Sequence, residues 1–185
     1  MEKVNQIENN IGFKKCFIAD IALMERIAEK AYIEHYSHIW KDGPEFYLNK
    51  SFSRDVFLEE LTRDTIEFYL IYYLEYPVGI IKINLFKDFR GNENPYMMEL
   101  EKIYIIKEYT GRKIGATTIS FLKHIAVNKN ISNIWLSVMT SSKSISFYKK
   151  QNFVSVSNWF LDFDNLKDDY REMLIMNLEI KPLQI

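Results

Sequence analysis

The sequence predicts an α/β protein, in the broad sense that includes α+β: a mixed, mostly antiparallel central sheet flanked by helices on both faces. Two observations support this. Apolar residues recur at helical spacing early in the chain, and β-branched and aromatic runs alternate with further helical segments from residue 66 onward. With 185 residues, of which 48% are hydrophobic, the chain can bury the core of one domain over residues 1–185, with that core at about 13–180.

The N-terminal part is expected to be helical. The first helix is predicted over residues 20–37, because Asp20 suits an N-cap and apolar residues follow at intervals of three and four. A second helix is predicted after Ser53, with Phe57 on its buried side.

The sheet is expected to begin with a hairpin and a long strand. Residues 66–73 and 78–86 form the hairpin, and residues 96–106 form the third strand. Simple alternation would place two sets of residues of this strand on opposite faces. The sets are Glu99, Glu101, Ile103 and Ile105 on one face, and Leu100, Lys102 and Tyr104 on the other.

The remaining elements alternate. A helix is expected from Gly111 to about Asn128, then a strand over 133–139 and a short helix over 142–151. Two closing strands are expected over 153–163 and 170–178.

Composition excludes several classes of function. The net charge of −1 argues against nucleic-acid binding, and the short apolar runs argue against a membrane span. A single cysteine, Cys16, and the lack of an apolar signal segment favour a cytoplasmic protein. His35 and His38 share a helix without a third ligand, so no metal site is expected.

Two glycines, Gly111 and Gly115, lie where a strand ends and a helix begins. A helix N-terminus presents unpaired N–H groups and partial positive charge, which suit phosphate. Arg112 and Lys113 add fixed positive charge to the same loop. On spacing alone the pattern favours a helix start with a tightly packed glycine, and phosphate binding is the alternative.

The stretch from Leu100 to Ala116 resembles the acetyl-CoA segment of the GNAT superfamily of N-acetyltransferases. The strand at 134–138 and the segment Phe147-Tyr148-Lys-Lys-Gln-Asn-Phe153 resemble the second half of that family's core. Residues 32–86 resemble one subgroup, the bacterial PaiA-type polyamine (spermidine/spermine) N-acetyltransferases. The resemblance covers about residues 18–178.

This resemblance implies an acetyl-CoA-dependent enzyme in which an amine attacks the thioester directly. Tyr148 would be the general acid, and Glu101 would be the base, with Glu99 competing for that role. His35, Tyr36, Trp40 and Glu99 would line the acceptor site. The implied acetyl-CoA site comprises Ile103, Tyr104, Ile105, Thr110, Gly111, Arg112, Lys113, Ile114, Gly115, Ala116, Ser141 and Ser144.

The acceptor is expected to be a small primary amine, with spermidine as the candidate polyamine. A polycation needs several carboxylates along its groove, for which Glu34, Glu99, Glu101 and the acidic stretch 162–169 are candidates. Two alternatives stay open: a peptide or protein amine as acceptor, and a catalytically weak acyl-CoA-binding module. Family members are often dimers, so a homodimer is a further expectation.

The chain departs from the family pattern at the glycine loop. Thr110 stands where the family usually has Gln or Arg, and Lys113 stands where it has glycine. Ser141 and Ser144 replace the usual Asn and Ala, and Asn152 replaces a glycine. The β-carbon of Lys113 could crowd a pyrophosphate, whereas its charge could offset that loss.

Overall fold

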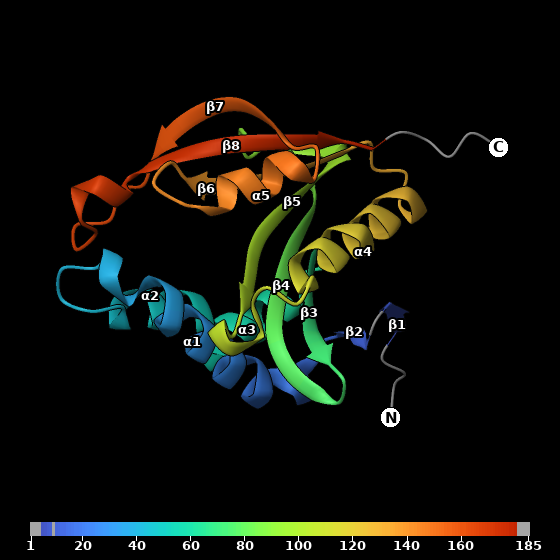
Figure 1. Ribbon diagram of the computed structural model, residues 1–185, viewed down its shortest axis with the longest axis horizontal. Coiled ribbons are helices and arrows are strands. Elements are labelled where there is room, and N and C mark those ends of the chain that lie inside the picture. Colours follow the sequence, from blue (N-terminus) through green and yellow to red (C-terminus); the bar gives the residue numbers. More distant parts are fainter. Residues whose placement is uncertain (1–4, 9, 181–185) are drawn as a thin grey trace.

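The computed structural model describes residues 5–8 and 10–180. Its helices and strands follow one another along the chain in the order shown in Figure 1. They are β1 (Asn5–Glu8), β2 (Ile11–Lys15), α1 (Ile21–Tyr36), α2 (Glu45–Phe52), α3 (Arg54–Leu61), β3 (Ile66–Tyr73), β4 (Tyr76–Lys87), β5 (Glu93–Ile105), α4 (Ile114–Asn128), β6 (Asn133–Met139), α5 (Ser144–Lys150), β7 (Val154–Phe160) and β8 (Glu172–Glu179).

Within the described residues, the strands form one eight-stranded sheet in the order β1-β2-β3-β4-β5-β6-β8-β7. The strands pair antiparallel except for β5 and β6, which run parallel. Helices α1 to α3 cover one face, and α4 and α5 lie on the other (Figure 1). The predicted fold class is confirmed.

Two separate cores hold these layers together. On one face, Leu70 and Ile80 of the sheet are buried with the apolar stripe of α1. On the other face, Ile81 and Ile83 are buried with the apolar side of α4. Neighbouring residues of β4 thus enter opposite cores, as expected for a strand in the middle of a covered sheet.

The sequence missed two N-terminal features. The β1–β2 hairpin was not predicted, because its residues lack a clear alternation and it is held by pairing of β2 with β3, which is distant in sequence. Helix α2 was not predicted either. Helix α4 begins at Ile114 rather than at Gly111, because Gly111 and Lys113 have positive φ values of 79° and 64°.

Asp20 does not cap the first long helix with its side chain. Its carboxylate accepts hydrogen bonds from the Phe17 backbone N–H (3.1 Å) and from Lys14 Nζ (2.6 Å). It therefore stabilises the short 3-10 turn Ile18–Asp20 that leads into α1.

The predicted faces of β5 are wrong beyond Leu100 because the strand contains a bulge. Lys82 of β4 pairs with Lys102, whereas the next residue, Ile83, pairs with Leu100. Glu101 is the extra residue between these two pairs. Leu100 consequently lies in the α4 core, while Lys102 and Tyr104 point to the side of α1 to α3.

Candidate active site

The site arises where β5 and β6 part. The two strands pair only between residues 97–99 and 133–135, and β5 then continues to Ile105 without β6 beside it. Figure 1 shows the two strands diverging from this point. Two cavities open at the split, one toward the loop before α4 and one among aromatic rings.

The loop cavity has a volume of about 500 Å³ and lies beside residues 109–116. Its lining includes Lys113 and Lys150, and no Asp or Glu among the described residues that surround it. The N-terminus of the 15-residue helix α4 opens at the same place. Two ammonium groups and a helix N-terminus make this cavity complementary to a phosphorylated ligand.

The loop residues differ in where they point. Thr110, Gly111, Lys113, Ile114, Gly115 and Ala116 line the loop cavity. Arg112 does not line it, because its guanidinium lies 5.3 Å from the Tyr73 ring centre and 5.6 Å from that of Tyr109. The phosphate contact expected from Arg112 is therefore not part of this arrangement.

Gly115 has a packing reason to be glycine. A Cβ at this position would lie 3.1 Å from the Phe147 ring of α5. The absent side chain lets α4 approach α5, which carries Tyr148. Lys113, by contrast, takes the left-handed conformation that glycine adopts more readily, and so does Asn152 (φ 70°).

The segment Ile103–Ile105 forms one wall of the loop cavity. It pairs with β4 on one edge, and in the described part of the chain no strand pairs with its other edge. His35 Nε2 donates to the Ile105 carbonyl oxygen over 2.9 Å, which ties α1 to the end of β5. His35 lines the loop cavity and not the aromatic cavity.

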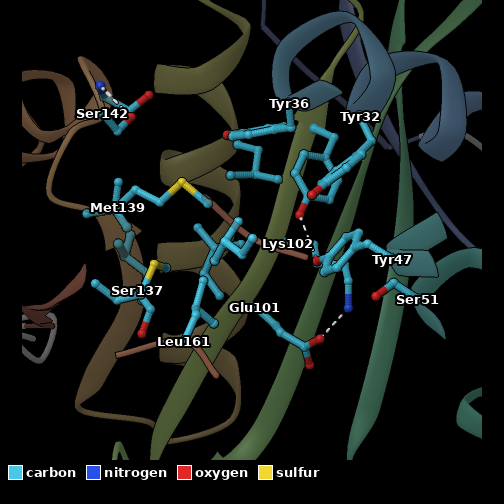
Figure 2. Close-up of a pocket in the computed structure, with 18 of the residues that line it drawn as sticks. Tyr32, Tyr36, Tyr47, Ser51, Glu101, Lys102, Ser137, Met139, Ser142 and Leu161 are labelled. Carbon is cyan, nitrogen blue, oxygen red and sulfur yellow. Dashed lines mark hydrogen bonds and ion pairs between the residues drawn. The ribbon is translucent and has the colours of Figure 1, made fainter. Parts of the chain in front are cut away.

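The aromatic cavity has a volume of about 360 Å³ and is shown in Figure 2. Tyr32 stacks on Tyr47 with ring centres 4.6 Å apart, and Tyr104 meets Tyr32 edge-on at 5.5 Å. Trp40 Nε1 donates to the Tyr32 hydroxyl over 3.1 Å, so the indole N–H is satisfied inside the structure. The expected acceptor residues Tyr36, Trp40 and Glu99 all line this cavity.

A chain of charged residues lies along β4 and β5 at this cavity. The Glu101 carboxylate pairs with Lys82 Nζ at 2.7 Å and also with Lys102. Burial alone would raise the pKa of the Glu101 carboxyl, but the two lysines outweigh burial and lower it to about 2. A carboxylate stabilised in this way is a weak proton acceptor, because a general base works best with a pKa near 7.

Glu99 and Glu34 are also engaged. Glu99 Oε2 lies 2.6 Å from Lys87 Nζ, and Asn84 Nδ2 donates to both Glu99 (2.6 Å) and Glu101 (2.7 Å). Glu34 accepts from the Lys107 backbone N–H over 2.7 Å and does not line the aromatic cavity. The acidic stretch 162–169 borders the cavity through Phe163 and Leu166, while its four aspartates are exposed.

Tyr148 stands between the two cavities. It is 8% exposed and lines both of them, together with Tyr36, Ile103, Tyr104 and Ser144. Burial, with the neighbouring Tyr36, raises the pKa of Tyr148 above its ordinary value, so the phenol keeps its proton at neutral pH. Ser141 lines neither cavity, while its neighbour Ser142 lines the aromatic one.

Sequence reasoning missed several site residues. Simple alternation placed Lys102 on the opposite face from Glu101. The bulge that brings the two side chains together cannot be recognised from the order of polar and apolar residues. Lys82 and Tyr47 come from other elements and meet β5 only in the fold. Lys150 follows Tyr148 by two residues in the sequence, which could have marked it as a neighbour of the loop cavity.

The described residues meet the requirements of neither a membrane-spanning helix nor a metal site with three clustered ligands. Among residues 5–8 and 10–180, no helix has the length and apolarity needed to span a membrane. In the same described residues, His, Cys, Asp and Glu do not gather in a group of three that could hold a metal ion.

Solved structures share this fold. The PaiA N-acetyltransferase from Thermoplasma acidophilum, solved with coenzyme A, is 23% identical with a TM-score of 0.70, covering 91% of this chain and 98% of that one. A spermidine N-acetyltransferase SpeG mutant from Vibrio cholerae is 14% identical with a TM-score of 0.68, covering 93% and 95%. A Salmonella typhimurium acetyltransferase that modifies the N-terminal serine of ribosomal protein L7/L12 is 11% identical with a TM-score of 0.71, covering 97% and 100%.

The model of the acetyltransferase (GNAT) family matches residues 22–153, which include α1 from its second residue on, the loop before α4 and Tyr148. Members of this family take the acetyl group from acetyl-CoA, and the loop cavity has the charge and backbone donors to hold such a ligand. The chain belongs to the acetyltransferase (GNAT) family and is an acetyl-CoA-dependent N-acetyltransferase.

Proposed function

We propose that this enzyme transfers the acetyl group to a small primary amine held in the aromatic cavity, without a covalent enzyme intermediate. The observation that carries the proposal is the junction of the two cavities at Tyr148, Ser144 and the inner segment of β5. A donor in the loop cavity and an acceptor in the aromatic cavity would meet there. Holding the thioester and the amine side by side turns a bimolecular reaction into an effectively unimolecular one, which lowers the entropic part of the barrier.

The loop cavity would hold the CoA moiety. Backbone N–H groups of the loop before α4, with Lys113 and Lys150, would bind its phosphates. The unpaired edge of Ile103–Ile105 would bind its amide-bearing arm in the manner of an added strand. When bound, acetyl-CoA supplies a thioester whose carbon accepts the amine.

Residues at the junction have distinct chemical roles. Tyr148 donates a proton toward the departing sulfur, because its buried phenol stays protonated at neutral pH. Backbone N–H groups of β5 polarise the carbonyl that is attacked. Glu99 and Glu101 would lie near the amine, with both carboxylates already paired with lysines.

The acceptor class has two candidates. A polyamine such as spermidine is supported by the resemblance to PaiA-type enzymes and by the names of two structural neighbours. A peptide α-amine is supported by the neighbour that modifies an N-terminal serine. A cytoplasmic location and a homodimer stay predictions.

The test is amine-dependent release of CoA thiol in the presence of acetyl-CoA, with the N-acetylated product identified by mass. A panel of small amines, spermidine and a short peptide is offered. Tyr148→Phe is expected to lower kcat by about a hundredfold, because it removes the acid while keeping the ring. The matched control is Tyr96→Phe, since Tyr96 is 61% exposed and lines neither cavity.

The outcomes separate the enzyme from a binding module. Acetyl-CoA binding without thiol release for any amine would support the module and overturn the proposed transfer. Equal kcat for Tyr148→Phe and the wild type would remove Tyr148 from the acid role.

A further inference from the structure

The carboxylates of the aromatic cavity are both neutralised by lysines. Glu99 and Glu101 are its acidic lining residues within the described chain. Glu99 pairs with Lys87, and Glu101 pairs with Lys82 and Lys102. Lys82 and Lys102 are almost fully buried, with side chains 4% and 9% exposed, so solvent does little to weaken these pairs.

The pairs belong to one balanced network. Lys82 Nζ also lies 2.5 Å from Glu60 Oε1 of α3, and Asn84 joins Glu99 to Glu101. From α2, Tyr47 lines the same cavity as Lys102, and its hydroxyl lies 3.4 Å from the Tyr104 hydroxyl. Three carboxylates and three ammonium groups therefore face one another.

This balance has two consequences for an incoming amine. An ammonium group that enters the cavity would lose its hydration, and the paired carboxylates would not compensate for that loss. The Lys102 ammonium, which lines the same cavity, would also repel it. Glu101 is also a weak proton acceptor, because two lysines hold its pKa at about 2. The Glu99 carboxylate is already engaged by Lys87 and Asn84. A protonated amine would neither be attracted nor be deprotonated there.

We infer that the acceptor binds as a neutral amine, and that the substrate class is a weakly basic α-amine with an aromatic body, rather than a polyamine. The inference rests on the proposed function and narrows its substrate. Rings of Tyr32, Tyr36 and Tyr47 line the cavity and suit an aromatic group. In this proposal the ammonium form of the acceptor gives a proton to water in solution, and the resulting neutral amine binds.

The size of the preference follows from basicity. An α-amine has a pKa of about 7.7–8.0, against about 10.4 for a lysine-type amine. At pH 7.4 about a quarter of the first, but only about one in a thousand of the second, is neutral. The weaker nucleophilicity of the less basic amine cancels part of this difference, which leaves an expected preference of about tenfold or more.

The bonds and protons balance without another reactant. The amine nitrogen forms a bond to the thioester carbon, and the carbon–sulfur bond breaks. The second proton leaves the nitrogen for solvent water, and the sulfur takes one from Tyr148, which solvent reprotonates. The products are an amide and free CoA thiol.

The test compares phenylalaninamide, phenethylamine and spermidine as acceptors, measured as kcat/KM from pH 6.5 to 9.5. We expect phenylalaninamide to exceed the other two by about tenfold or more at pH 7.4. Its profile should level off near pH 8, while that of phenethylamine keeps rising. Spermidine or phenethylamine equal to or better than phenylalaninamide at pH 7.4 would overturn the inference, whereas no turnover of any amine would overturn the proposed function.

Variants of Lys102 test the cause. Lys102→Met leaves Glu101 with one lysine, so we expect the spermidine-to-phenylalaninamide ratio of kcat/KM to rise at least about fivefold. Lys102→Arg keeps the charge and should restore the wild-type ratio. The matched control is Lys15→Met, which removes a lysine from Glu67 at 2.7 Å, a residue that does not line the aromatic cavity. If Lys102→Met melts cooperatively and its spermidine-to-phenylalaninamide ratio is unchanged, the ion-pair network does not determine acceptor choice. If this variant does not fold, the comparison of acceptors in the wild type decides the inference.

Discussion

Replacing Lys113 by glycine tests whether this unusual loop residue helps or hinders acetyl-CoA binding. Lys113 has φ 64° directly before α4, and its side chain reaches the loop cavity. Glycine would restore the family's usual residue, remove the β-carbon and remove one positive charge. The two alternatives left by the sequence therefore predict changes of opposite sign.

The structure favours a loss of affinity. Lys113 is exposed and its ammonium would act on phosphate through partly screened charge, a contribution of about 1 kcal/mol or about fivefold in Kd. Glycine relieves about 1 kcal/mol of left-handed strain in the folded chain, but its greater freedom in the unfolded chain offsets most of this gain. We expect weaker CoA binding with little change in stability.

Calorimetric titration with CoA measures this directly, at low and high salt. Lys113→Met is the companion variant, because it keeps the β-carbon and loses only the charge, and it should also bind about fivefold more weakly. Arg112→Ala is the control, since Arg112 stacks on Tyr73 and Tyr109 outside the loop cavity. Tighter binding by Lys113→Gly would show that the β-carbon crowds the ligand and would refute the charge argument.

Three further predictions concern the framework of the site. Gly79→Ala places a Cβ 2.5 Å from the Tyr104 carbonyl oxygen, so it should lower the free energy of unfolding by about 2 kcal/mol or more in urea titration; wild-type stability would refute the close approach of β4 and β5. Trp40→Phe removes the 3.1 Å hydrogen bond to Tyr32 and should cost about 1 kcal/mol, and a more stable variant would argue against that bond. Because the folded pKa of Glu101 is lowered from 4.5 to about 2, its stabilising effect is present above pH 4.5 and is lost as pH falls toward 2. Urea titrations over this range should show a flatter pH dependence for Glu101→Gln, and a parallel curve would contradict the ion pairs.

Much of the fold could be predicted because its strongest signals are local. The stripe of α1 and the hairpin of β3 and β4 are visible in residue spacing alone. The β1–β2 hairpin was missed because it depends on pairing of β2 with a strand more than fifty residues away along the chain. Tertiary pairing of this kind overrides weak local preference.

The site could be predicted in outline but not in its charges. Tyr148 and the glycine loop were found through family resemblance, since sequence spacing alone gave each of them an ordinary structural reading. The pairing of Glu101 with Lys82 and Lys102 required the bulge in β5 and the register of β4. One extra residue in a strand changes which side chains share a face, and single-sequence patterns do not reveal it.

Binding of a conjugate tests most directly whether the two cavities form one site. Phenylalaninamide joined through an acetyl bridge to the sulfur of CoA would place one part in each cavity, with the link beside Tyr148. By calorimetry, this conjugate should bind at least about tenfold more tightly than CoA, because the second contact becomes intramolecular. The gain should disappear when phenylalaninamide lacks its aromatic ring. A conjugate that binds no more tightly than CoA would contradict a shared site at Tyr148.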